Sequence, residues 1–339
     1  MSGAERAGPA LVRTPARPYT ASMSPAKRTG PGSPRASAWL RERVAAEGSE
    51  LSRVKRALAE RGLAPLKRMG QNFLVNEDLA RRIVEQCRLE EDDVAVEIGP
   101  GAGALTERLA ARVRTLIAVE KDAGLAALLR EELAELPRLE LVEGDFLEFD
   151  LVEAARAHGV ERLVVVGNIP YNITTPVLER IFEQKRAVKS AVLLVQKEYA
   201  ARLAAAAGTP EYGSLTLFAR YHALLDPLLA IRASAFWPRP DVDSTLVRFF
   251  LRERPPVEAD EALLFRIIRG SFHMRRKQLA NTLEETLALG REGIERLCRV
   301  AGIDSRRRGE TLTLEEFAKL ARAAARIGPP AGSGEGDDH

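Results

Sequence analysis

Residues 168–171 combine three groups that together suit one kind of chemistry. They read Asn168, Ile169, Pro170 and Tyr171 and follow the apolar run 163–167, which is typical of a buried strand. The Asn168 side-chain oxygen and the Pro170 carbonyl can accept both hydrogens of an exocyclic amine on a planar base. The amine lone pair then turns toward an electrophilic methyl group, which is catalysis by positioning without a covalent enzyme intermediate.

The base itself needs a surface and a route of access. Tyr171 offers an aromatic face on which a base can stack, and such stacking is worth roughly 1–3 kcal/mol per base. The target base must be extruded from a duplex or lie in a single strand. Residues 168–171 therefore predict methylation of an amino group on a nucleobase.

A glycine turn at residues 97–103 predicts a nucleotide-like cofactor. Gly99 and Gly101 permit close approach of the backbone, and the following helix is expected to offer free amide groups. Gly99, Gly101 and Ala104 also satisfy the looser dinucleotide pattern, so a nicotinamide dehydrogenase is an alternative.

Acidic residues at three successive strand ends favour S-adenosylmethionine as that cofactor. Glu97 precedes the turn by two residues, which suits a cationic, amino-acid-bearing ligand better than a pyrophosphate. Glu120 is placed to accept both ribose hydroxyls. Asp145 is placed to accept the amine of the cofactor's adenine.

Alternating strand and helix patterns predict the scaffold for these residues. Helices are expected over 76–88, over 103–113 and up to residue 136. The expected strands are 94–98, 116–120, 139–143, 163–166, 191–196, 224–232 and 246–251. This order predicts an α/β fold with a mostly parallel, doubly wound, Rossmann-like sheet and with ligands outside the carboxyl ends of its strands. Together with the acids at the strand ends, we expect the sheet of a class I S-adenosylmethionine-dependent methyltransferase. After a proline-bearing linker at 253–259 the pattern is helical.

The predicted organisation has four parts. Residues 1–50 are rich in Pro, Ser, Ala, Gly and Arg and are expected to be a disordered basic extension. They are interpreted as a dispensable tail or a start site assigned too early, with a transit peptide as the alternative. Residues 51–252 form the predicted catalytic domain and 258–325 a helical RNA-binding domain. Residues 329–339 are expected to be a solvated tail.

Composition narrows the class of protein. The formal charge is only +3, so the total does not demand a nucleic-acid partner. Cys87 and Cys298 are isolated and the four histidines are scattered, so neither a disulfide framework nor a metal site is expected. No apolar run approaches the roughly 20 residues of a membrane span. We therefore expect a cytoplasmic protein.

Basic clusters indicate where RNA phosphates would be contacted. Lys67 and Arg68 lie just before residue 71, and Arg275, Arg276 and Lys277 are expected on a helix of the second domain.

An ordered series of motifs resembles the KsgA-type small-subunit ribosomal RNA adenine dimethyltransferases (dimethyladenosine transferases) over about residues 62–325. The series is 71–74, 97–103, Glu120, 144–145, 168–173, 196–198, 212–213, 238–244 and 275–277. The resemblance implies that Asn72 and Leu74 close over the cofactor, with Gly99, Glu120, Asp145 and Asn168 as further contacts. It also implies that Phe236 covers the face of the target base opposite Tyr171.

The resemblance further implies a substrate and a setting. Members of this family transfer four methyl groups to two adjacent adenosines in a hairpin near the 3′ end of small-subunit RNA, late in subunit assembly. The implied partner is small-subunit ribosomal RNA within a 30S assembly intermediate. We expect the enzyme to be a monomer that binds neither a metal ion nor a membrane.

Three alternatives remain within this resemblance. The related enzyme that dimethylates large-subunit RNA and confers macrolide resistance shares the 168–171 segment. Residues 212–215, Pro176 and 275–277 favour the small-subunit class. A non-catalytic assembly factor would lack the intact Asn168 loop that is present here. The last alternative is an organellar enzyme whose relatives also act in transcription.

Overall fold

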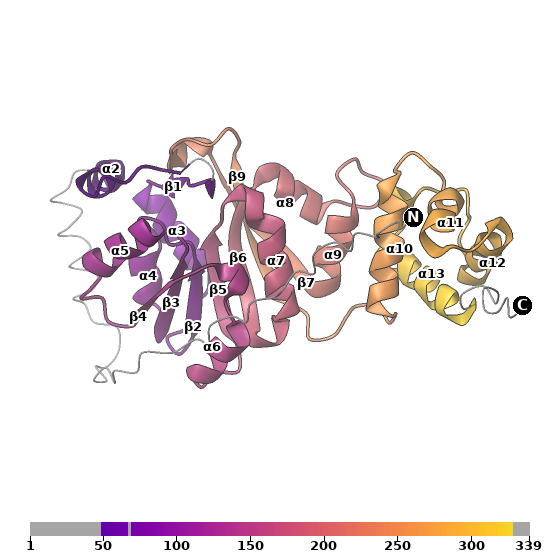
Figure 1. Cartoon of the computed structure of the whole chain (residues 1–339), viewed down its shortest axis with the longest axis horizontal. Coiled ribbons are helices and arrows are strands. Elements are labelled where there is room, and N and C mark those ends of the chain that lie inside the picture. Colours follow the sequence, from indigo (N-terminus) through magenta and orange to yellow (C-terminus); the bar gives the residue numbers. More distant parts are fainter. Residues whose placement is uncertain (1–48, 67–68, 328–339) are drawn as a thin grey trace, which may run out of the picture.

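The computed structural model describes residues 49–66 and 69–327, and its centre is a seven-stranded sheet (Figure 1). The strand order is β4-β3-β2-β5-β6-β9-β7, and a separate pair joins β1 to β8. The strands are β1 Phe73–Leu74, β2 Val94–Ile98, β3 Thr115–Glu120, β4 Leu139–Glu143, β5 Leu163–Asn168, β6 Val188–Gln196, β7 Ala223–Ile231, β8 Phe236–Trp237 and β9 Ser244–Leu251.

The helices precede, connect and follow these strands. The α-helices are α2 Glu50–Glu60, α3 Glu77–Gln86, α4 Thr106–Ala110, α5 Ala123–Glu132, α6 Leu151–Ala157, α7 Thr174–Glu183, α8 Lys197–Ala204, α9 Ser214–His222, α10 Glu261–His273, α11 Leu279–Leu287, α12 Arg291–Ala301 and α13 Leu314–Ile327. Short 3-10 helices are Phe146–Glu148, Tyr171–Ile173, Lys185–Ala187, Ala233–Ala235 and Gly309–Thr311.

The sheet confirms the predicted α/β class and the strands that the sequence indicated. Strands β4, β3, β2, β5 and β6 pair in parallel, whereas β9 is antiparallel to both of its neighbours, β6 and β7. The chain runs outward from β2 to β4 on one side and from β5 to β6 on the other. The strand order therefore reverses between β2 and β5, which is where such sheets bind ligands.

Both faces of the sheet are covered because successive side chains of a strand point to opposite faces. On β2, Val94 and Val96 join a core with residues of α6 and α7. Ala95, between them, joins a second core with residues of α3 and α4. The strands accordingly read as continuous apolar runs with little polar alternation.

One predicted helix is much shorter than expected. Residues 103–113 were predicted to be helical, but α4 spans only Thr106–Ala110 and a series of turns precedes it. The reason is the backbone of the glycine segment, where Gly99, Gly101 and Gly103 all have positive φ values. Such residues cannot continue into a right-handed helix, so the helix begins later.

The helices after residue 260 gather at one end of the molecule, away from α2 (Figure 1). Their core takes in Tyr212, Leu217 and Tyr221, which precede the linker. The Tyr212 hydroxyl donates to the backbone oxygen of Leu312 at 2.7 Å. The small C-terminal helical part is thus packed onto the region of α9.

Several predicted boundaries fall at the edges of the described residues. Residue 50, the last of the segment predicted to be disordered, begins α2. The predictions for 1–48 and for the tail at 329–339 lie outside the described residues. The division between a catalytic domain ending at 252 and an RNA-binding domain beginning at 258 stays a prediction.

Candidate functional site

One cavity opens at the carboxyl ends of β2, β3, β4 and β5, at the point where the strand order reverses. It brings together ten of the predicted site residues, from five separate stretches of the sequence. They are Asn72, Leu74, Glu97, Gly99, Gly101, Glu120, Asp145, Asn168, Pro170 and Tyr171.

The glycine turn after β2 forms one wall of the cavity. Gly101 has a φ of +60°, and a Cβ atom added there would lie 3.1 Å from Cδ1 of Phe73. The Gly103 amide donates to the Pro100 oxygen at 2.9 Å, which closes the turn. Only glycine fits Gly101 without moving Phe73, so the backbone itself faces the cavity.

Glu120, at the end of β3, holds this turn from the cavity side. Its Oε2 accepts from the Gly101 amide at 3.0 Å and its Oε1 from the Asp122 amide at 2.9 Å. Burial raises the pKa of Glu120, although these amide hydrogen bonds favour the charged form. Each oxygen retains a further lone pair, so the carboxylate can also accept from hydroxyl groups.

Glu97, at the end of β2, is a buried carboxyl with one unsatisfied oxygen. The residue is 2 % exposed, and its Oε2 has no hydrogen-bond partner among the described residues. Burial raises its pKa to about 8; the Thr106 hydrogen bond opposes this shift and the charge of Glu120 adds to it. An unpaired carboxyl lining a cavity suits a cationic group such as an ammonium. The residues present therefore fit the amino-acid part of S-adenosylmethionine.

Asp145 lines the cavity beside a lysine that the sequence analysis did not single out. Lys121 Nζ lies 2.6 Å from Asp145 Oδ2, and the Leu147 amide donates to Asp145 Oδ1 at 3.0 Å. Lys121 also lines the cavity. The sequence could have indicated Lys121, because it directly follows Glu120 at the end of β3. Residues just past the carboxyl ends of parallel strands gather at one edge of the sheet.

The side chain of Asn168 is oriented by a hydrogen bond to residue 72, in the segment 69–74 that lines the cavity. Its Nδ2 donates to the backbone oxygen of Asn72 at 3.0 Å. A carbonyl oxygen can only accept, so this contact requires the amide nitrogen on that side and leaves Oδ1 on the other. The side-chain acceptor of Asn168 is thereby fixed.

Tyr171 is half-buried, and its hydroxyl lies 2.7 Å from Ser244 Oγ. Burial raises the pKa of Tyr171, so the phenol stays neutral at physiological pH. Tyr171 follows Pro170 directly, and both residues line the cavity.

The segment 69–74, which we call the strap, passes along the cavity and is held at both ends. Gln71 Nε2 donates to Asp122 Oδ2 at 3.2 Å, and Gln71 Oε1 accepts from the Leu66 amide at 2.8 Å. At the far end β1 pairs with β8. These two-residue strands were not predicted, because so short a pairing leaves no periodic pattern.

Phe236 is the predicted site residue near the strap that the structure does not bring to the cavity. It is 4 % exposed in β8, opposite Leu74, and is not among the residues that line the cavity. Its predicted contact with the target base stays a prediction.

The predicted RNA-binding residues lie elsewhere. Arg275, Arg276 and Lys277 were expected on a helix, but they occupy the turn between α10 and α11 because Met274, with a φ of −125° and a ψ of 72°, ends α10. Arg275 donates to the backbone oxygens of Pro210 at 2.8 Å and Tyr212 at 2.9 Å. Lys67 and Arg68 lie outside the described residues.

The described ranges contain neither a grouping of metal ligands nor a membrane-spanning helix. Within 49–66 and 69–327, no three or more His, Cys, Asp or Glu side chains are grouped so as to hold a metal ion. In the same ranges no helix is both long and apolar enough to cross a membrane.

Comparison with known proteins places most of the chain in one family. The model of the ribosomal RNA adenine dimethylase family matches residues 65–325. The ribosomal RNA small subunit methyltransferase A of Geobacter metallireducens is 42% identical, over 79% of this chain and 98% of that protein. The protein of the same name from Geobacillus sp. is 38% identical, over 81% of this chain and 97% of that protein.

Solved structures share the fold. A dimethyladenosine transferase from Plasmodium falciparum superposes with a TM-score of 0.63 at 22% identity, covering 75% of this chain and 98% of that one. The 23S rRNA methyltransferase ErmE gives 0.57 at 27% identity, covering 74% and 99%. The family match overturns the nicotinamide dehydrogenase alternative. The chain belongs to the ribosomal RNA adenine dimethylase family, and its cofactor is S-adenosylmethionine.

Proposed function

We propose that this chain, an S-adenosylmethionine-dependent dimethyltransferase of adenine in small-subunit ribosomal RNA, acts on N6 of two adjacent adenosines near the 3′ end, within a 30S assembly intermediate. The observation that carries the site assignment is the fixed amide of Asn168, which lines the same cavity as the buried acids of β2 and β3. The substrate assignment is supported by relatives named small subunit methyltransferase at 38–42% identity. The large-subunit enzyme ErmE is 27% identical.

The cofactor supplies a methyl group on a positively charged sulfur. In our proposal the Gly99 and Gly101 backbone approaches it closely, Glu97 faces its ammonium group and Glu120 accepts its ribose hydroxyls. Asp145 accepts its adenine amine, and Asn72 and Leu74 cover it from the strap. The orphan oxygen of Glu97 and the close contact of Gly101 with Phe73 support these roles.

Asn168 and Pro170 would hold the target amine. The adenine amine is a poor nucleophile because its lone pair is delocalised into the ring. When Asn168 Oδ1 and the Pro170 oxygen accept its two hydrogens, the nitrogen is free to pyramidalise and direct its lone pair at the methyl group. The new N–C bond forms as the S–C bond breaks, and the proton then leaves the cationic nitrogen for solvent.

Tyr171 would provide the stacking surface for the same base, with Phe236 on the opposite face. The hydrogen bond between the Tyr171 and Ser244 hydroxyls helps to orient the ring before the base arrives. Phe236 is buried, so this half of the proposal requires β8 to shift when RNA binds. Arg276 and its neighbours would contact RNA phosphates. We also propose a monomer that acts in the cytoplasm.

The experiment that tests the positioning role compares Asn168→Ala with Asn168→Asp in single-turnover methyl transfer. We expect either change to lower the transfer rate by about a hundred- to a thousandfold, the range found when one preorganised hydrogen-bonding group is removed. Cofactor affinity should change far less. Asn168→Asp is informative because it keeps an acceptor but loses the donor to Asn72.

Tyr171→Phe is the matched control, because it removes only the hydroxyl bonded to Ser244 and keeps the ring. Its rate should stay within a fewfold of the wild-type rate. Near-normal turnover of Asn168→Ala would contradict the mechanism.

A further inference from the structure

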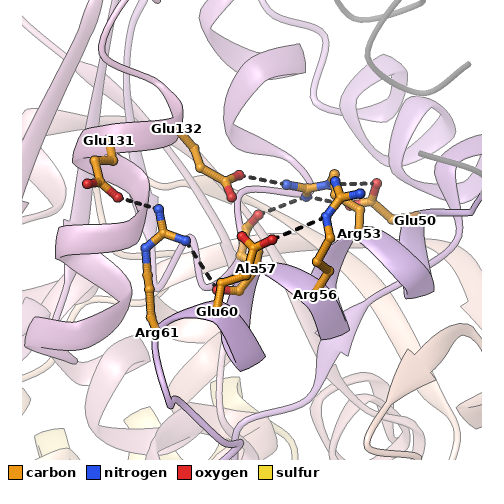
Figure 2. Close-up of polar contacts among 9 residues, drawn as sticks. Glu50, Arg53, Arg56, Ala57, Glu60, Arg61, Glu131 and Glu132 are labelled. Carbon is orange, nitrogen blue, oxygen red and sulfur yellow. Dashed lines mark hydrogen bonds and ion pairs between the residues drawn. The ribbon is translucent and has the colours of Figure 1, made fainter. Parts of the chain in front are cut away.

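Helix α2 carries a buried arginine whose charge is directed at the cofactor turn. Arg53 is 11% exposed, and its guanidinium lies between Glu50 of the same helix and Glu132 of α5 (Figure 2). The distances are 2.6 Å to Glu50 Oε1 and 3.1 Å to Glu132 Oε2. The Arg53 nitrogen that contacts Glu50, Nη2, also donates to the backbone oxygen of Ala102 at 2.9 Å.

Ala102 lies in the glycine turn that lines the cavity. Glu120 accepts from the amide of Gly101, and Arg53 donates to the carbonyl of Ala102. Two oppositely charged side chains therefore hold consecutive residues of the turn. Three glycines with positive φ would otherwise give this turn more backbone freedom than any other wall of the cavity.

We infer that Arg53 is a positioning residue, which keeps the turn at 99–103 in its cofactor-binding conformation through the Ala102 carbonyl. The inference rests on the proposed cofactor site. It assigns a role to a helix that lies outside the matched family segment, 65–325. Arg53 touches neither cofactor nor substrate in this account and acts only through the turn.

The simpler alternative is that Arg53 merely attaches α2 to the sheet. Apolar packing already does so, since Val54, Ala57 and Leu58 are buried against Leu125 and Leu129 of α5. Buried ion pairs add little net stability because desolvation offsets their attraction. Attachment alone therefore does not explain why the guanidinium is buried against the turn.

Arg61, the C-cap residue of α2, is the control for Arg53. It lies about two turns after Arg53, on the same side of α2, and bonds to Glu131 of α5 and to the Ala57 oxygen (Figure 2). Both arginines thus link α2 to the last turn of α5, where adjacent acids face the negative end of the helix dipole. Arg53 also donates to the turn, whereas the guanidinium of Arg61 donates to Ala57 and Glu131, neither of which belongs to the turn.

The test is a calorimetric titration of the full chain with S-adenosylmethionine and with S-adenosylhomocysteine, using Arg53→Ala, Arg53→Lys and Arg61→Ala. Loss of one charge-assisted hydrogen bond should raise the dissociation constant of Arg53→Ala about tenfold. Arg61→Ala should change it less than about twofold on the same scale. Arg53→Lys should be impaired as well, because an ammonium lacks the fork that serves Glu50 and Ala102 together.

A kinetic readout separates positioning from a loss of folding. Arg53→Ala should raise KM for the cofactor and leave kcat at saturating cofactor within about twofold, since lost ground-state binding raises KM alone. If Arg53→Ala does not fold, Arg53→Lys carries the test. Equal effects of Arg53→Ala and Arg61→Ala, or a fall in kcat without a change in KM, would overturn the inference.

Glu120→Ala separates a failure of the proposed cofactor site from a failure of the role proposed for Arg53. If Glu120→Ala weakens cofactor binding and Arg53→Ala does not, the cofactor site stands and only the role of Arg53 is wrong. If Glu120→Ala leaves the affinity unchanged, the proposed site fails and the inference fails with it.

Discussion

The cavity at the sheet and the helices after residue 260 use charged side chains in opposite ways. In the cavity, Glu97 and Glu120 are buried, and Glu120 is held by backbone amides. In the turn after α10, by contrast, the basic residues are exposed, and Arg275 and Lys277 pair with Glu310 and Glu285. The comparison teaches that a few desolvated acids mark the site better than a dense run of basic residues.

Among the changes that test this difference between the cavity and the C-terminal helices, Glu120→Ala is expected to have the largest effect on cofactor affinity. Glu120→Ala removes the proposed ribose acceptor and frees the Gly101 amide, so the cofactor dissociation constant should rise about ten- to a hundredfold. RNA affinity should be unchanged. The matched control is Glu143→Ala, which removes an acid at the end of β4 that does not line the cavity. Equal cofactor affinities in both variants would refute the ribose assignment.

A smaller effect separates two neighbouring arginines in the turn after α10. Arg275 donates to the Pro210 and Tyr212 oxygens, so Arg275→Ala should cost about 1 kcal/mol and lower Tm by about 2–4 °C. Arg276→Ala should leave Tm unchanged, weaken RNA binding a fewfold and reduce the slope of log affinity against log salt by about 1.

Thermal unfolding and salt-dependent RNA binding of both variants measure this difference. If Arg276→Ala leaves the affinity and the salt slope as in the wild type, the turn after α10 is not a phosphate-binding surface. If the two variants exchange these effects, the division between structural and RNA-binding arginines is wrong.

A different kind of effect, a pH dependence of stability, is predicted from Glu97. Its pKa is about 8 in the folded protein, against an ordinary value near 4.5. Between these values the folded state binds the proton and the unfolded state does not, so the free energy of unfolding falls as pH rises through 8. The stabilising contribution is complete below about 4.5.

Glu97→Gln keeps the buried shape but does not titrate. Thermal unfolding of the cofactor-free protein between about pH 6 and 9 should therefore fall less steeply with pH in this variant than in the wild type. Identical slopes would show that Glu97 is already charged in the folded protein.

The sequence predicted the parts of the molecule whose signal is local. The β-branched runs of β2 and β5 predicted strands, and Asn76 predicted the start of α3, which its side chain caps at the Leu79 amide. The glycine turn and the residues at strand ends predicted the cavity, because carboxyl ends of parallel strands share one edge.

What the sequence did not predict depends on contacts between distant segments. Arg53 reaches Ala102 across 49 positions, and its neighbours in sequence give no sign of that contact. The burial of Phe236 opposite Leu74 depends on the pairing of β8 with β1, which only the folded chain shows. The glycine turn also delays the start of the helix predicted over 103–113, because the pattern of apolar residues does not record positive φ values.

The most direct test of the central claim is transfer of labelled methyl groups from S-adenosylmethionine to unmethylated 30S particles. Large subunits and naked small-subunit RNA are assayed in parallel, and the product nucleosides are resolved. We predict label in N6,N6-dimethyladenosine on the 30S particle, and none on the large subunit. Label on the large subunit, or none on either with cofactor binding intact, would contradict the account.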